Sequence, residues 1–244
     1  MRTNNDMCEL GAADASIVRR GVLKLVATAA AGLTIAQHAL AAGPPKAENV
    51  LSPDAALDRL MKGNARYVEG LSRRHDFKHE REALSKGQNP FAAVLSCADS
   101  RIAPEYCFDT ARGDVFVCRV AGNFASDDIV ASLEYTVTVL NTPLILVLGH
   151  ESCGAIDATI KSIKDGTTLP GHMRNLVTAL APAVHAVQGE PGDLLANAIR
   201  RNVTLNAKKL KTSAPILKSF VDDHRVRVVG GIYQLKTGRV ELLA

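Results

Sequence analysis

The sequence predicts an α/β fold: one domain with a mostly parallel central β-sheet flanked by helices, and a C-terminal hairpin at the sheet. Three runs are almost wholly apolar, which is typical of strands buried on both faces and therefore of parallel sheets. Amphipathic helical patterns separate and follow these runs. Hydrophobic residues make up 47% of the 244 residues and charged residues 22%, which excludes a disordered or fibrous chain. The three runs are residues 91–96, 115–120 and 144–148.

The elements around the first two strands follow from local signals. A helix is predicted from Pro53 to about Glu69, because Ser52 is a good N-cap and proline suits the first helical position. Residues 71–90 are polar and charged, so we expect a loop with a short helix. Another helix begins after Ser126, and its apolar face consists of Ile129, Leu133, Val137 and Leu140.

The elements after the third strand are mostly helical. Helical patterns cover residues 154–163, 173–188, 193–211 and 214–221. The chain then has an apolar run at 226–235, a Lys-Thr-Gly turn at 236–238 and a last run at 239–243. This arrangement predicts a strand and a hairpin that end the sheet.

Residues 1–41 have the layout of a secretory signal peptide, with a charged region, an apolar segment and a small-x-small cleavage site at Ala39-Leu40-Ala41. The apolar segment, residues 25–36, is too short to span a hydrocarbon core about 30 Å thick. Arg19 and Arg20, followed by Val22-Leu23-Lys24, resemble a twin-arginine signal, which exports folded proteins from bacteria. Val22 departs from that pattern, which prefers Phe there. An uncleaved anchor helix over residues 21–42 is the alternative reading.

The leader predicts a periplasmic protein that is cleaved near Ala41 and has no stable membrane insertion afterwards. Residues 42–52 are expected to form a linker, and residues 53–244 the folded domain. The net charge of +4, from 29 basic and 25 acidic residues, is not gathered into basic runs. The chain has no Trp and only 4% aromatic residues, so nucleic-acid bases have little to stack on. We therefore expect no nucleic-acid partner.

Chemistry-bearing residues follow two of the predicted strands. Cys97 comes directly after the first strand, and His150 and Cys153 come directly after the third. Ligands gather at the carboxyl ends of strands in open parallel sheets. Two thiolates and an imidazole suit Zn²⁺, and three protein ligands leave the open position of a catalytic zinc site. Asp99 lies within reach of such a metal. The spacing alone leaves open that these are ordinary buried residues.

The other cysteines and histidines lack such a pattern. Cys107 and Cys118 are expected to be inert core thiols, although a disulfide between them stays open in an oxidising compartment. Cys8 leaves with the signal peptide. His75 and His79 are four residues apart in a charged segment and are expected to be solvated surface residues, as are His172, His185 and His224.

Two motifs together resemble the signature of the β-class carbonic anhydrases: Cys97-x-Asp99-Ser100-Arg101 and His150-x-x-Cys153. The resemblance extends over about residues 54–244. It includes residues 57–64, the segment 113–123, Glu134-Tyr135 and the Gly-Gly-Ile-Tyr of the final hairpin, residues 230–233. It implies a β-carbonic anhydrase-like catalytic domain at residues 53–244.

The resemblance implies an enzyme that hydrates carbon dioxide reversibly to bicarbonate and a proton. Cys97, His150 and Cys153 would bind one Zn²⁺ per subunit, and a zinc-bound hydroxide would attack CO₂. Asp99 would orient that hydroxide, and Arg101 would hold Asp99 off the metal. In some members of the family the equivalent Asp ligates the zinc instead and closes the site.

The resemblance also implies a substrate pocket lined by Gln88, Phe116 and Tyr135, some of them from a partner subunit, in a homodimer or homotetramer. Core packing is the rival interpretation for Phe116 and Tyr135. Family members with an inhibitory bicarbonate site have a Trp near the position of Val94, and this chain has none. We therefore expect no bicarbonate inhibition of that kind.

Three other functions stay open at this point. The same zinc site could serve a hydrolase of carbonyl sulfide or carbon disulfide, since the sequence does not show the width of the pocket. A non-catalytic zinc-binding protein would need a fourth protein ligand, which Asp99 could supply. A thiol redox protein based on Cys97 would lack the usual Cys-x-x-Cys pair.

Overall fold

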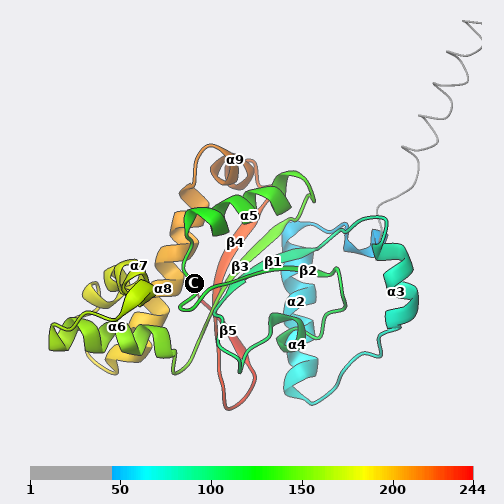
Figure 1. The fold of residues 1–244 in the computed structure, drawn as a ribbon. Helices are drawn as coiled ribbons and strands as arrows, with labels where there is room; N and C mark the ends of the chain where they lie inside the picture. Colours follow the sequence, from blue (N-terminus) through cyan, green and yellow to red (C-terminus); the bar gives the residue numbers. More distant parts are fainter. Residues whose placement is uncertain (1–45, 244) are drawn as a thin grey trace, which may run out of the picture. The chain divides into compact units, whose positions relative to one another are not determined.

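The computed structural model describes residues 46–243, so the predicted signal peptide and its Arg19-Arg20 pair lie outside the described residues. The centre is a five-stranded sheet in the order β2-β1-β3-β4-β5 (Figure 1). The first four strands pair in parallel, and β5 pairs with β4 in antiparallel fashion. The predicted fold class is confirmed, and so is the C-terminal hairpin. The strands are β1 (Ala92–Ser96), β2 (Val115–Arg119), β3 (Leu144–His150), β4 (Arg227–Tyr233) and β5 (Val240–Leu243).

Helices cover both faces of this sheet (Figure 1). On one face α2 packs against β1 and β3; on the other, α5 packs against β1 and β2, and α8 against β3 and β4. The crossovers explain why β1 and β3 read as continuous apolar runs: every residue of both strands is buried. The helices are α2 (Pro53–Val68), α3 (Phe77–Leu84), α4 (Pro104–Cys107), α5 (Asp127–Thr138), α6 (Gly154–Asp165), α7 (Arg174–His185), α8 (Leu194–Thr212) and α9 (Ile216–Asp222), with the 3₁₀ turns η1 (Ala47–Asn49) and η2 (Gly171–Met173).

The capping signals located the starts of α2 and α5. The Ala55 N–H donates to Ser52 Oγ at 3.3 Å, and the Ile129 N–H donates to Ser126 Oγ at 3.5 Å. Leu133 is buried in the face of α5 that packs on the sheet, as expected. The helix ends at Thr138, so Leu140 lies beyond it.

Two segments contain structure that local sequence patterns did not predict. The short helix α4 has only four residues, too few to leave a periodic pattern in the sequence. Residues 46–52 belong to the expected linker, yet they contain η1 with the fully buried Asn49. Lys46 Nζ lies 2.7 Å from Asp114 Oδ1, and Asn49 Nδ2 donates to the same oxygen at 3.1 Å. These contacts attach the segment to Asp114, which directly precedes the edge strand β2, across a distance in sequence that local patterns do not cover.

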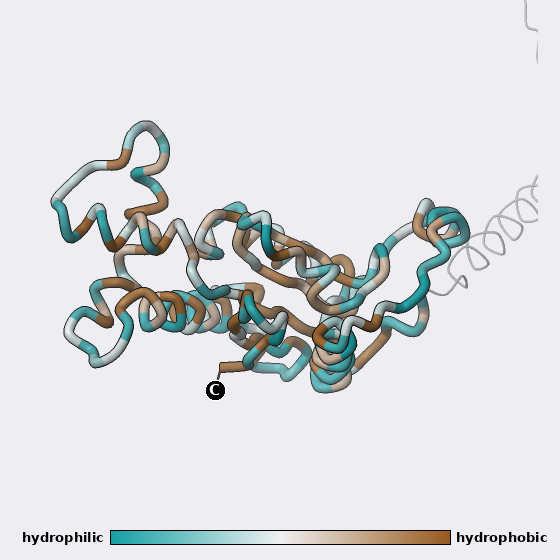
Figure 2. Tube along the Cα trace, turned by 90° about the horizontal axis from the view of Figure 1, so that it is seen from below, coloured by the Kyte–Doolittle hydropathy of each residue, from teal (hydrophilic) through white to brown (hydrophobic). Residues whose placement is uncertain are grey.

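The helix α3 is the least integrated of the described helices. It buries none of its residues, and the chain trace is mostly hydrophilic there in Figure 2. This agrees with the expected loop and short helix at residues 71–90. No helix in residues 46–243 is both long and apolar enough to cross a membrane.

Candidate metal centre

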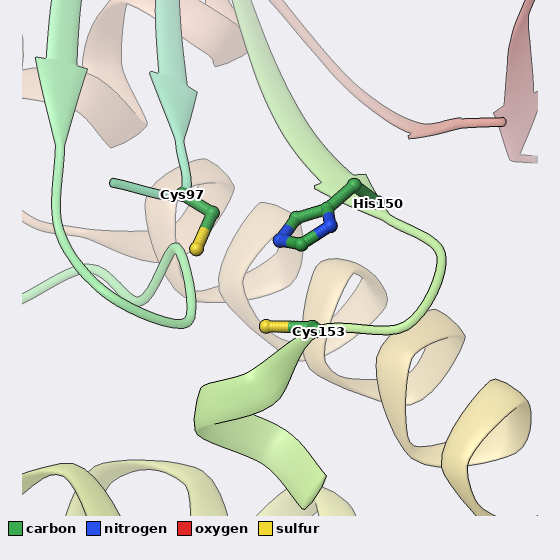
Figure 3. Close-up of side chains that lie close together, drawn as sticks. All are labelled: Cys97, His150 and Cys153. Carbon is green, nitrogen blue, oxygen red and sulfur yellow. The ribbon is translucent and has the colours of Figure 1, made fainter. Parts of the chain in front are cut away.

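The three predicted ligands converge at the carboxyl edge of the sheet. Cys97 directly follows β1, His150 is the last residue of β3, and Cys153 is the N-cap residue of α6. Because β1 and β3 are parallel neighbours, their carboxyl ends meet, and the ligand atoms of all three side chains lie within 4.8 Å of one another. Figure 3 shows both sulfurs and the imidazole directed toward a common point. All three residues are buried.

The orientation of His150 fits a metal ligand. Its Nδ1 lies 2.9 Å from the Glu151 carbonyl oxygen, which fixes the proton on Nδ1. Its Nε2 is buried and has no hydrogen-bond partner among the described residues. A buried polar atom without a partner is costly. Two thiols and a free imidazole nitrogen are the donor set that zinc prefers, so the residues fit the ion that the resemblance implies.

The two thiols of the centre have pKa values shifted in opposite directions. A hydrogen bond from Cys153, together with one from the Gly122 N–H, lowers the pKa of Cys97 well below that of an ordinary cysteine, against the opposing effect of burial. The hydrogen bond to Cys97 and burial raise the pKa of Cys153. Because metals bind cysteine as the thiolate, a metal cation at this site would displace the thiol protons.

A carboxylate–guanidinium pair lies beside the three ligands. Arg101 donates from Nε to Asp99 Oδ1 at 2.9 Å and from a terminal nitrogen to Oδ2 at 2.8 Å. The Arg101 backbone N–H also donates to Oδ1, at 2.9 Å. These bonds from Arg101 hold the pKa of Asp99 far below its usual range. Asp99 Oδ2 lies 3.8 Å from His150 Nε2, so this carboxyl group faces the three candidate ligands.

Backbone contacts fix the loops that hold the ligands. Arg119 donates to the carbonyl oxygens of Cys97, Asp99 and Ile102 at 2.8–3.0 Å, so one side chain braces the whole turn after β1. Glu151 Oε2 accepts from the Leu235 N–H at 3.0 Å, which attaches the His150–Cys153 turn to the end of β4. The sequence includes Arg119 in the segment 113–123 that resembles the family, but it does not indicate the roles of Arg119 and Glu151. Their hydrogen-bond partners lie 17 to 84 residues away along the chain.

The predicted pocket residues lie away from the centre within one chain. Gln88 is exposed and precedes β1, whereas Cys97 follows it, so a strand of about 16 Å separates them at about 3.3 Å per residue. Phe116 on β2 and Tyr135 on α5 form an aromatic pair with ring centroids 6.4 Å apart. Phe116 is half-buried and packs against the hydrophobic core, whereas Tyr135 is 46% exposed.

The remaining cysteines behave as expected. Cys107 and Cys118 are free and buried, and burial raises the pKa of each to about 11. The histidines His79, His172, His185 and His224 are exposed. His75 is less exposed than expected, because its side chain packs beside Glu80, with Nδ1 3.7 Å from Oε1.

Comparison with known proteins identifies the family. The model of the family described as carbonic anhydrase matches residues 92–240, which include both strand ends and all three ligands. The chain belongs to the carbonic anhydrase family. It is 38% identical to "Carbonic anhydrase 2" of Mycobacterium tuberculosis and 36% identical to the carbonic anhydrase of Mycolicibacterium smegmatis, each match covering 78% of this chain and 93% of the relative. The protein is therefore an enzyme of the carbonic anhydrase type.

Solved structures place the fold in the β class of carbonic anhydrases. The structure of the β-carbonic anhydrase CcaA superposes with a TM-score of 0.61 at 28% identity, covering 77% of this chain and 95% of the other. A chain from the crystal structures of two tetrameric β-carbonic anhydrases of Sordaria macrospora shares the fold, with a TM-score of 0.63 at 24% identity. The match covers 78% of this chain and 98% of the other.

Proposed function

We propose that the protein is a zinc-dependent β-carbonic anhydrase that converts carbon dioxide and water reversibly to bicarbonate and a proton. One observation carries the proposal: the buried Cys97–His150–Cys153 group, with its unpartnered imidazole nitrogen, faces the carboxylate of Asp99, which Arg101 binds at both oxygens. A purely structural zinc site has four protein ligands and no use for such a carboxylate.

Zinc would be held by Cys97 Sγ, Cys153 Sγ and His150 Nε2. When bound there it supplies the Lewis acidity that makes a water molecule nucleophilic near neutral pH. Asp99 would accept a hydrogen bond from the attacking water and so orient its lone pair toward the carbon atom of CO₂. The proposed reaction needs no covalent bond between substrate and protein.

Arg101 acts on Asp99 rather than on the substrate. Its two-point contact fixes both carboxylate oxygens, and the same terminal nitrogen donates to the Ser152 carbonyl at 3.1 Å. The pair therefore connects the turn after β1 with the turn after β3. In this arrangement Asp99 is engaged by arginine, which favours an open fourth position over a site closed by Asp99.

We also propose that a second copy of the chain completes the substrate pocket, in a homodimer or homotetramer. Gln88 lies at the opposite end of β1 from Cys97, so it reaches a zinc centre only in another subunit. Large apolar side chains are exposed near β2, with Tyr106 75% and Val139 58% exposed, as expected of a surface that a partner covers.

Stopped-flow CO₂ hydration by the zinc-assayed protein tests the proposed reaction. We expect turnover that rises with pH between about 6.5 and 9 and scales with bound zinc. A zinc-replete protein without hydration activity would refute it. Turnover of carbonyl sulfide or carbon disulfide by that protein would then identify the sulfur-substrate hydrolase.

Mixing two inactive variants tests the shared pocket. Cys97→Ser removes a ligand and Gln88→Ala removes the pocket residue, so each homo-oligomer has only damaged sites. Mixed oligomers contain one site with both residues intact, and activity should return after exchange of subunits. Absence of activity in oligomers shown to be mixed contradicts the shared pocket.

We propose a periplasmic location, on the strength of the leader at residues 1–41. Replacing Arg19 and Arg20 together by Lys should retain the protein in the cytoplasm. Unchanged export of that variant argues against the twin-arginine route.

A further inference from the structure

A row of polar side chains on α8 faces the loop between β2 and α5. The row consists of Asn202, Asn206 and Lys209, spaced by four and three residues so that they share one face of the helix. Asn202 is fully buried and Asn206 nearly so. Buried amides inside a helix are unusual unless each finds partners, so their contacts matter.

Every member of the row binds the backbone of that loop. Asn202 Nδ2 donates to the Gly122 carbonyl at 2.8 Å, and Asn206 Oδ1 accepts from the Ala125 N–H at 2.8 Å. Lys209 Nζ donates to the Ala125 carbonyl at 2.6 Å. The two amides also contact each other, since Asn206 Nδ2 donates to Asn202 Oδ1 at 2.9 Å.

The loop leads directly to the metal centre. The Gly122 N–H donates to Cys97 Sγ at 3.2 Å. Gly122 has φ +84°, and a Cβ atom there would lie 2.7 Å from Leu180 Cδ1, so only glycine allows this approach. Gly122 is thus held on one side by Asn202 and donates on the other side to a sulfur ligand.

We infer that Asn202 is a positioning residue for the zinc centre: through Gly122 it sets the hydrogen bond to Cys97 Sγ and thereby the electron density that this sulfur offers the metal. The inference rests on the proposed zinc function. A hydrogen bond to a thiolate stabilises its negative charge and fixes the direction of the sulfur, and loss of partners of this kind typically lowers metal affinity about 10–100-fold.

The test compares Asn202→Leu with Asn64→Leu. Asn64 is a matched control because it is also fully buried and makes three hydrogen bonds, to Cys107 O, Gly238 O and Val240 N, none of which leads to Cys97. Both variants lose stability, because buried polar groups lose their partners. Only Asn202→Leu should move the thiolate-to-cobalt charge-transfer band of the Co²⁺-substituted protein, and only it should lower zinc affinity, by about 10–100-fold in a chelator competition.

Two outcomes would overturn the inference. An unshifted cobalt spectrum and unchanged zinc affinity in folded Asn202→Leu overturn it, and so do equal shifts in both variants. If Asn202→Leu does not fold, Asn202→Ser, which removes the long amide with less disruption, takes its place with the same expectations. Hydrogen exchange at the Gly122 amide of the metal-free protein should also be faster in the Asn202 variant than in the control.

The test separates this inference from the proposed function. Spectrum and affinity report on Cys97 whether or not CO₂ is hydrated. A wild-type protein that binds cobalt through its thiolates but hydrates no CO₂ removes the proposed reaction and leaves the role of Asn202 to be decided by the spectra.

Discussion

Two pairs of buried cysteines lie in different surroundings. Cys97 and Cys153 stand at the ends of elements, where a backbone N–H, an imidazole and each other surround the sulfurs. Cys118 lies within β2, where burial alone raises its pKa, and the pKa of Cys107 in α4 is raised mainly by burial as well. All four are buried to a similar extent. Burial therefore does not distinguish the two pairs: Cys97 and Cys153 can hold a metal because their positions at the carboxyl ends of β1 and β3 place them beside His150.

Two carboxylates, Asp99 and Asp109, are each paired with an arginine but differ in their position relative to the candidate metal ligands. Arg101 lowers the pKa of Asp99 beside the metal ligands. Burial would raise the pKa of Asp109, but bonds from Arg66, the Arg73 N–H and Ser72 outweigh it and lower this pKa as well. Asp109 is surrounded by its own partners and faces no ligand group, so its ion pair serves the fold alone.

The largest effect is expected when one cysteine of each pair is replaced and zinc affinity is compared. Cys97→Ser should lower zinc affinity by at least about 100-fold, since one ligand's share of a binding free energy of roughly 10–16 kcal/mol is lost. Cys118→Ser should keep its zinc and its CO₂ hydration and lose only stability. Chelator competition and stopped-flow rates measure both. Equal zinc loss in the two variants contradicts the assignment of the ligands.

The next largest effect is on kcat, and it should distinguish Asp99 from Asp109. Asp99→Asn should retain zinc but lower kcat about 10²–10⁴-fold, the usual contribution of a positioned proton acceptor. Asp109→Asn should leave kcat within a few-fold of wild type, because Asp109 contacts neither zinc ligands nor Asp99. A comparable drop in kcat for both variants counts against a role for Asp99 in the reaction.

A smaller effect concerns stability and its pH dependence. The folded-state pKa of Asp109 is lowered below the unfolded value of about 3.9, so its carboxylate stabilises the fold above that pH and loses this contribution as pH falls through the folded-state pKa. Asp109→Asn should therefore lower the free energy of unfolding by about 1–3 kcal/mol at pH 7. Urea titrations at pH 7 and in stronger acid should show the gap closing. A constant gap speaks against ionic stabilisation by Asp109.

The smallest effect concerns the rates at which the buried cysteines are alkylated. In folded, metal-stripped protein at pH 7, iodoacetamide should alkylate Cys97 at least about 10-fold faster than Cys107 or Cys118, because a thiol of pKa about 11 is about 0.01% thiolate at that pH. Peptide mass spectrometry gives the order of labelling. Preferential labelling of Cys118 shows that the surroundings of the sulfurs were misjudged.

Much of the fold and the ligand set could be predicted because their signals are local. Continuous apolar runs predict β1 and β3, the capping Ser52 and Ser126 mark helix starts, and cysteine or histidine directly after a strand marks a functional edge. The sequence did not predict the four-residue α4 or the 3₁₀ turn around Asn49, because neither leaves a periodic pattern. The turn also depends on a contact with Asp114, which is distant in sequence.

From the sequence by itself, strand periodicity predicted the parallel sheet and placed Cys97, His150 and Cys153 at strand ends as candidate ligands, because these signals act within a few residues. The family resemblance added the pairing of Asp99 with Arg101. The tertiary structure alone decided which groups support that centre. Asn202 meets Gly122 across 80 residues and Glu151 meets Leu235 across 84. Contacts over such distances depend on how the elements pack, and packing satisfies buried polar groups with whichever partner the fold brings near.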